Sequence, residues 1–168
     1  VPCFNEEDNL ADTIGALAKL VYPDFEVLAV NDGSSDQTAE ILELLQQRYA
    51  FLRAVNLEHN RGKAMALRAG VAATDAEYII CIDGDARLDA NAVNWLVYGL
   101  KLRPNIGGVT GNPRIYNRKT VLGRLQVGEF SSIIGLIKRT QSIYDRVFTV
   151  SGVVCGFRKR ALHEVDYW

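Results

Sequence analysis

The stretch YIICIDGD, residues 78–85, decides how the rest of the sequence is interpreted. Its first five residues are apolar and rich in isoleucine, which is typical of a short strand buried on both faces. Side chains two positions apart on an extended chain point the same way, so Asp83 and Asp85 are expected to face one crevice. Gly84 leaves room there for a ligand to approach the backbone. A polar turn that merely ends the strand would use the same residue types, so the neighbouring segments must decide.

Apolar strands with polar ends recur on both sides of this stretch. Further strands are predicted at residues 25–30, 51–57 and 106–110, and a later apolar run covers 147–154. Residues at helical spacing separate them, namely Leu10, Ile14 and Leu17; Ile41, Leu42, Leu45 and Tyr49; Met65, Leu67 and Val71; and Val93, Leu96, Val97 and Leu100. A further helix is predicted around residues 129–143. This alternation predicts an α/β fold, a mostly parallel sheet with helices on both faces, whose ligands bind at the carboxyl ends of the strands.

The composition agrees with a single folded domain. The chain has 168 residues, of which 48% are hydrophobic and 23% charged. A domain of this length buries about two thirds of its unfolded surface, so its stability requires neither disulfides nor a structural metal. Cys3, Cys81 and Cys155 are widely spaced among apolar residues, which favours reduced core thiols. A metal ion would therefore serve chemistry.

Charge is distributed unevenly along the chain. Residues 1–100 carry 7 basic and 16 acidic side chains, whereas residues 101–168 carry 12 basic and 4 acidic ones. The acidic part suits a metal site and the basic part suits phosphates or an anionic membrane surface, although two differently solvated faces would give the same pattern. No apolar run approaches the roughly 18 to 20 residues that cross a bilayer, and no signal peptide precedes Val1, so we expect this chain to be soluble. Both ends look like interior sequence, which indicates a piece of a larger protein.

Asp83 and Asp85 are predicted to bind a divalent metal ion. Their hard oxygen ligands suit Mg²⁺ or Mn²⁺, which keeps several waters and takes its remaining ligands from substrate phosphates. Asp32 ends the strand at residues 25–30, where its carboxylate could accept hydrogen bonds from a base N–H or a ribose hydroxyl. Asp36, or a serine before it, is predicted to cap the next helix. These positions indicate a nucleotide-diphosphate site.

Two other strand ends carry polar residues. Asn5 and Glu6 follow the first strand, and Asn5 with Asp8 resembles a capping box. Residues 60–63 open a helix at which backbone N–H groups and the Lys63 ammonium could meet a diphosphate, although the pattern is not that of a Walker A loop. Four successive strand ends thus predict one site for a nucleotide, a diphosphate and a metal ion.

These motifs resemble the nucleotide-sugar half of processive family 2 glycosyltransferases, which have a Rossmann-like GT-A fold. The resemblance rests on VPCFNEE (1–7), VNDGSSD (30–36), NRGKAMALRAG (60–70) and IDGDA (82–86), and it continues through GGVTGNPRIYNR (107–118), LGRLQVGEFSSIIGLIKRTQ (122–141) and VFTVSGVVCGFRKRAL (147–162). The later motifs look most like the poly-β-1,6-N-acetylglucosamine synthases of bacterial biofilm. The resemblance implies an inverting, metal-dependent transfer of N-acetylglucosamine from UDP-N-acetylglucosamine to a growing β-linked polysaccharide.

The resemblance also implies roles for single residues. Asp32 would contact the uracil, Lys63 the diphosphate, and Asp83 the ribose and metal, with Asp85 as the direct metal ligand. Asp83 and Asp85 are the catalytic residues that it implies within this chain. Pro2, Asn5 and Glu6 belong to the expected substrate-binding residues at the uridine pocket. Ser151, Gly152 and Arg158 fall where the acceptor channel of the family approaches the donor, although a buried strand followed by a basic cluster would explain them equally well.

The sequence lacks two features of the family, the Thr-Glu-Asp motif that supplies the general base and the Gln-x-x-Arg-Trp motif. We therefore expect residues 1–112 to be the donor-binding part and 113–168 the start of the acceptor side. The missing motifs and the flanking membrane helices would belong to a longer protein of the bacterial plasma membrane, with this domain on the cytoplasmic face and an accessory membrane subunit as a possible partner. On its own, this chain should bind donor and metal but polymerise poorly.

Three other functions stay open. A cellulose, hyaluronan or chitin synthase would share the donor motifs. A nucleotidyltransferase would need a Gly-rich loop after the first strand, where this chain has Asn5 and Glu6. A non-catalytic nucleotide-binding or assembly subunit is compatible with the missing base. His59 and His163 are isolated and lack metal-ligand spacing, and no nucleic-acid partner is expected.

Overall fold

The computed structural model describes residues 1–114, 127, 136–144, 150 and 152–167. Its strands are β1 (Pro2–Cys3), β2 (Val27–Asp32), β3 (Leu52–Leu57), β4 (Tyr78–Ile82), β5 (Gly108–Thr110) and β6 (Val154–Arg158). Its helices are α1 (Leu10–Leu17), α2 (Thr38–Arg48), α3 (Lys63–Ala72), α4 (Ala92–Lys101), α6 (Lys138–Ile143) and α7 (Lys159–Glu164). The predicted strands and helices within the described residues are confirmed, with boundary shifts of a few residues.

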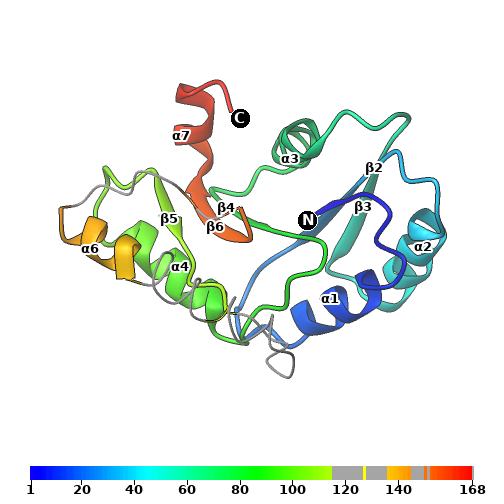
Figure 1. Ribbon diagram of the computed structural model, residues 1–168, viewed down its shortest axis with the longest axis horizontal. Helices are drawn as coiled ribbons and strands as arrows, with labels where there is room; N and C mark the ends of the chain where they lie inside the picture. The colour runs from blue at the N-terminus through cyan, green and yellow to red at the C-terminus, as the bar shows by residue number, and fades with distance from the viewer. Residues whose placement is uncertain (115–126, 128–135, 145–149, 151, 168) are drawn as a thin grey trace.

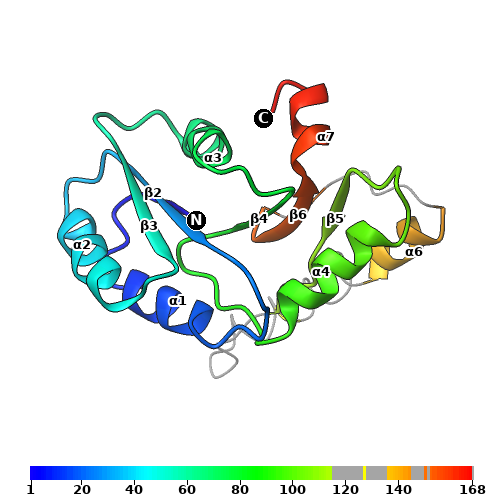
Figure 2. The ribbon, with the colours of Figure 1, turned by 180° about the vertical axis from the view of Figure 1, so that it is seen from behind.

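The first sheet has the strand order β1-β2-β3, and all its pairs are parallel. Pro2 pairs with Val30, and Val27 pairs with Leu52. Helices α1 and α2 cover one face of this sheet and α3 covers the other (Figures 1 and 2). Leu10, Ile14 and Leu42 are fully buried on the α1 and α2 side because they repeat at helical spacing toward the sheet.

The second sheet has the order β4-β6-β5, and both its pairs are antiparallel. Cys81 lies opposite Cys155, and Val109 lies opposite Gly156. The α/β class with parallel strands and helices on both sides is confirmed by the first sheet. The second sheet differs, because β6 runs antiparallel to both of its neighbours. The sequence could not show this, because a buried strand has the same apolar pattern in either direction.

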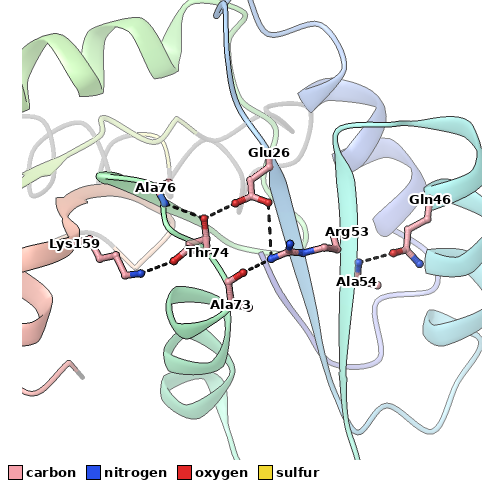
Figure 3. Close-up of polar contacts among 8 residues, drawn as sticks. All are labelled: Glu26, Gln46, Arg53, Ala54, Ala73, Thr74, Ala76 and Lys159. Carbon is pink, nitrogen blue, oxygen red and sulfur yellow. Dashed lines mark hydrogen bonds and ion pairs between the residues drawn. The ribbon is translucent and has the colours of Figure 1, made fainter.

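Polar contacts at the amino ends of the strands tie the two sheets to α3 (Figure 3). Arg53 of β3 pairs with Glu26 at 3.9 Å and donates to the Ala73 carbonyl, while the Thr74 hydroxyl donates to Glu26. Lys159 opens α7 directly after β6 of the second sheet, and its ammonium donates to the Thr74 carbonyl. Both cations therefore bind carbonyl groups at the carboxyl end of α3, where the helix dipole favours positive charge.

All three cysteines are free and buried, as the sequence predicted. Burial raises the pKa of the Cys3 thiol to about 11. Within the part of the chain that the structure describes, no helix combines the length and the apolar character needed to traverse a bilayer. The predicted helix at residues 129–143 contains α6 in its described part, and residues 147–149 and 151 of the later apolar run lie outside the description.

Candidate functional site

The ends of β3 and β4 meet through Lys63 and Asp83. Lys63 is the first residue of α3, and its ammonium forms an ion pair with the Asp83 carboxylate. The same ammonium donates to the Gly152 carbonyl at 3.3 Å. The side chains remain 50% and 26% exposed, so the pair lies at the surface of the site. An incoming anion can therefore reach the ammonium without the protein having to open.

Asp32 holds the segment that carries Lys63. Its side chain is 2% exposed, and its two carboxylate oxygens accept hydrogen bonds from the backbone N–H groups of Arg61 and Gly62, at 2.9 and 2.8 Å. Charge-assisted bonds to two consecutive N–H groups fix the position of this backbone. Asp32 therefore positions the start of α3, a role that the sequence did not reveal.

Gly33 allows the loops after β2 and β3 to pack against each other. It has a positive φ of 67°, and a Cβ atom there would lie 2.5 Å from the Asn60 nitrogen and 2.6 Å from the His59 carbonyl carbon. Only glycine fits such a conformation and such a close backbone approach. The contact of these loops explains why Asp32 and Lys63 come to the same place.

Asn5 and Glu6 join the loop after β1 to the start of α2. The Asn5 N–H donates to the Ser34 hydroxyl at 3.0 Å, the Asn5 side chain accepts from the Ser35 N–H at 3.0 Å, and the Glu6 N–H donates to the Thr38 hydroxyl at 2.9 Å. The prediction of a capping box formed by Asn5 and Asp8 is wrong. Helix α1 starts at Leu10 after Asn9, and the Asn5 side chain instead binds a neighbouring loop.

Asp36 stands just before α2 and stabilises its first turn. Its carboxylate accepts from the N–H groups of Thr38 and Glu7, at 3.0 and 3.1 Å, while Gln37 occupies the N-cap position. The predicted capping role of Asp36 is thus confirmed, although Asp36 lies one residue before the N-cap position. Desolvation acts to raise the pKa of Asp36, but these hydrogen bonds outweigh it and the net pKa lies below the usual value.

Gly84 is buried, and the group that approaches it in the structure is the Glu6 side chain. A Cβ atom at residue 84 would lie 3.1 Å from the Glu6 Cδ atom. The Gly84 carbonyl accepts a hydrogen bond from the buried Thr13 hydroxyl at 2.7 Å. Sequence reasoning missed Thr13 because a threonine inside a helix carries no sign of its tertiary partner. Together these contacts fix the backbone between Asp83 and Asp85.

The donor set at Asp83 and Asp85 fits a divalent metal ion. Asp85 is exposed, whereas Asp83 is half-buried and already accepts from Lys63. Among the described residues, no three acidic, histidine or cysteine side chains form a metal-ligating cluster. An ion that takes two protein carboxylates and completes its shell with phosphate and water oxygens needs no such cluster. Asp85 is the more accessible of the two carboxylates.

The remaining predicted site residues lie in different places. Pro2 of β1 pairs with Val30 of β2, and it lies three residues before Asn5. The Gly152 carbonyl accepts from the Lys63 ammonium. Ser151 lies outside the described residues. The structure does not bring Arg158 to the others. It is 9% exposed at the far end of β4, opposite Tyr78, and donates to the carbonyls of Leu100 and Ile106, to Glu77 and to the Tyr78 hydroxyl.

Residues 1–166 match the model of the family described as Glycosyl transferase family 2. The chain is 44% identical over 166 residues to a poly-beta-1,6-N-acetyl-D-glucosamine synthase of Staphylococcus epidermidis, and 41% identical over 166 residues to a synthase of the same name from Staphylococcus aureus. Each alignment covers 99% of this chain and 40% of the relative. The chain therefore spans about two fifths of the length of the curated relatives that it matches.

Solved structures share the fold. A mannosyltransferase from Pyrobaculum calidifontis, in complex with GDP-Man and Mn²⁺, superposes with a TM-score of 0.84 at 20% identity, over 99% of this chain and 45% of that one. Staphylococcus aureus TarS, residues 1–349 in complex with UDP-GlcNAc, gives a TM-score of 0.64 at 20% identity, over 98% of this chain and 46% of that one. At such identities the likeness supports the α/β glycosyltransferase fold.

Proposed function

The chain belongs to glycosyl transferase family 2, and from this premise we propose that it is the donor-binding part of an N-acetylglucosamine transferase. The full enzyme would transfer the sugar from UDP-N-acetylglucosamine to a growing β-linked exopolysaccharide at the bacterial plasma membrane, with this domain on the cytoplasmic face. The observation that carries the proposal is that Lys63 pairs with Asp83, while Asp32 binds the backbone N–H groups just before Lys63. Identity above 40% to two synthases supports the choice of sugar.

In the proposed complex, the Lys63 ammonium leaves Asp83 and binds the diphosphate. Its present partners are the half-buried Asp83 carboxylate and the Gly152 carbonyl, and the ammonium itself is half-exposed, so a diphosphate with several negative oxygens competes well for it. Asn5, Glu6 and Pro2 border the uridine. Asp32 would contact the uracil from the bottom of the site, where its carboxylate also binds the backbone N–H groups of Arg61 and Gly62.

Asp85, with Asp83, would hold Mg²⁺ or Mn²⁺. The ion, when bound, would stabilise the negative charge of the departing UDP. The residues of this chain then place the donor so that an acceptor hydroxyl attacks C1 of the sugar from the face opposite the departing UDP. The configuration at C1 is thereby inverted. The general base would come from outside this chain, so the chain alone should bind donor without polymerising it.

The first experiment measures UDP binding by isothermal titration calorimetry with and without Mn²⁺. We expect binding that strengthens at least about tenfold with the ion, which corresponds to about 1.4 kcal/mol. The Asp85→Ala variant should lose the strengthening by Mn²⁺. The matched control is Asp75→Ala, which removes an exposed carboxylate in the loop before β4.

Binding that ignores the ion in both the parent protein and Asp85→Ala would refute the metal proposal. The choice of sugar is tested separately in the full-length protein, by following radiolabel from UDP-N-acetylglucosamine and UDP-glucose into polymer. Incorporation from UDP-glucose alone would instead support a cellulose-type synthase. Tight UDP binding without incorporation from either donor would support a non-catalytic assembly subunit.

A further inference from the structure

Helix α4 leaves three large apolar side chains in solvent. Trp95 is 71% exposed, Tyr98 59% and Leu102 58%. They follow one another at intervals of three and four residues, so they form one stripe along the helix. Figures 1 and 2 show α4 at the outside of the molecule, with β5 and β6 on its inner side. The stripe therefore faces away from the domain.

The packing of α4 on its own domain does not use this stripe. The inner side of the helix consists of other apolar residues, all buried, namely Val93, Leu96, Val97 and Leu100. A helix on the surface of a soluble domain needs one apolar side only, and its outer side is normally polar. The second apolar side of α4 thus requires a separate explanation.

The aromatic residues of the stripe are already ordered. The rings of Trp95 and Tyr98 meet edge to face, with their centroids 6.3 Å apart and their planes at 88°. Single exposed apolar residues are common on protein surfaces, and Leu44 of α2 is one example at 65% exposure. A contiguous group that includes an ordered tryptophan and tyrosine is instead typical of the centre of a protein interface.

The two ends of α4 carry opposite charges. Asp89 lies in the turn before the helix, where its carboxylate accepts from the Asn91 N–H at 2.9 Å. Lys101 is the last residue of the helix, Arg103 follows two residues later, and the helix itself contains no acidic residue. An apolar stripe with an acidic group at one end and basic groups at the other becomes complementary to itself after a half-turn rotation.

We propose that α4 pairs with α4 of a second copy of this chain. The two helices run antiparallel across a two-fold axis near Tyr98, so that Trp95 of each copy packs on Leu102 of the other. Asp89 of one copy then lies toward the end of the helix that carries Arg103 of the other. The acidic end also argues against an anionic lipid surface as the partner, because headgroup phosphates would repel Asp89.

The contact between the two helices is short. The helix rises about 10 Å from Trp95 to Leu102, so the two stripes bury less than the roughly 1,200 Å² at which stable interfaces begin. We therefore expect a weak dimer, with a Kd of about 1 µM or higher. No residue of the stripe belongs to the proposed donor site, so the dimer does not depend on UDP or metal.

Sedimentation velocity measures the dimer. Over a concentration range of about 1 to 300 µM, the parent chain should change from monomer to dimer. Tyr98→Ser and Leu102→Ser should each raise the Kd at least about tenfold, because they remove the centre of the contact. Leu44→Ser is the matched control, since it removes a similarly exposed leucine from α2, and it should leave the Kd unchanged. All three side chains are exposed, so the Tm of each variant should stay near that of the parent.

Disulfide cross-linking tests the direction of the helices. Tyr98 lies near the two-fold axis, so Tyr98→Cys should form a disulfide with its own copy. The two Trp95 positions lie about 10 Å apart along the helices, beyond the roughly 7 Å between Cα atoms that a disulfide spans. Trp95→Cys alone should therefore not cross-link, whereas a mixture of Trp95→Cys and Leu102→Cys chains should form a mixed dimer.

Exchange of the charges tests the self-complementarity. Arg103→Glu turns a basic end toward an acidic one into two acidic ends and should raise the Kd at least about threefold, and a second substitution, Asp89→Lys, should reverse the effect. A parent chain that is monomeric over the whole range, an unchanged Kd for Arg103→Glu, or self-cross-linking of Trp95→Cys would each overturn the proposal. Binding of a monomeric parent chain to phosphatidylglycerol vesicles, lost in Tyr98→Ser, would overturn it in favour of a lipid surface. None of these outcomes bears on UDP binding, so failure here leaves the donor-binding proposal standing.

Discussion

At the scale of single residues, Asp32 shows how one side chain can serve both structure and ligand binding. Its carboxylate is almost fully buried and accepts two backbone hydrogen bonds from the segment that leads into Lys63. A ligand that contacts Asp32 therefore meets a group whose position the fold already fixes. The loop after β3 depends on this carboxylate even when no nucleotide is bound.

Asp32→Asn should destabilise the protein. An amide can accept only one of the two hydrogen bonds, and its NH₂ group would face a backbone N–H, which costs about 1 to 3 kcal/mol. Tm should fall by roughly 3 to 10 °C, and exchange at the Arg61 and Gly62 amides should accelerate. Glu58→Gln, which changes an 89% exposed carboxylate to the same amide, is the control and should leave both unchanged. An unaltered Tm in Asp32→Asn would contradict the positioning role.

Gly33 and Gly15 form a second test at this scale, because they differ in the space around them. Gly33→Ala places a Cβ atom 2.5 Å from the Asn60 backbone nitrogen at a positive φ, so we expect a loss of about 2 to 4 kcal/mol. Gly15 lies inside α1 with nothing within 4 Å of its Cβ position, so Gly15→Ala should gain up to about 1 kcal/mol. Urea unfolding measures both, and a similar effect of the two substitutions would contradict this account.

At the scale of elements, the start of α2 joins two loops of the site. Asp36 binds the N–H groups of Thr38 and Glu7, and the Thr38 hydroxyl binds the Glu6 N–H. The helix and the Asn5 loop therefore depend on each other. Because these bonds favour the ionised carboxylate, they link the stability of the element to pH.

The pKa of Asp36 is lowered in the folded protein, so its contribution is present above the usual value of 3.8 and disappears as the pH falls through the lower, folded value. Asp36→Asn should thus be less stable than the parent at pH 7. The difference should shrink as the pH falls below about 4, once the parent carboxyl is protonated. Urea unfolding at pH 7, 5, 4 and 3 measures this, and a difference that does not change over that range would exclude the linkage.

At the scale of the whole molecule, the two sheets are held together through α3 as well as through the core. Lys159, the first residue of α7 directly after β6, and Arg53 from the first sheet both bind carbonyls at the end of α3 (Figure 3). Within the second sheet, the buried guanidinium of Arg158 in β6 donates to the carbonyl of Leu100 in α4. Arg158, which the sequence analysis placed near an acceptor channel, thus serves the architecture at this end of the sheet.

Lys159→Met should weaken the link between the second sheet and α3. The charged hydrogen bond to the Thr74 carbonyl is partly exposed, so we expect a loss of about 1 to 2 kcal/mol and a fall in Tm of roughly 2 to 6 °C. Lys19→Met, at an exposed position after α1, provides the matched control with no fall in Tm. Equal stability of the two variants would show that the core alone holds the sheets together.

The sequence by itself determined the class of the fold, the order of the elements and the residues that stand at the strand ends, because apolar periodicity and strand-end chemistry are local properties of the chain. The family followed from the same motifs. Only the tertiary structure decided that β6 runs antiparallel, that Asp32 holds the backbone before Lys63, that Glu6 packs on Gly84, and that Arg158 lies far from the site. Strand direction and side-chain partners depend on contacts between segments distant in sequence, and no local pattern encodes them.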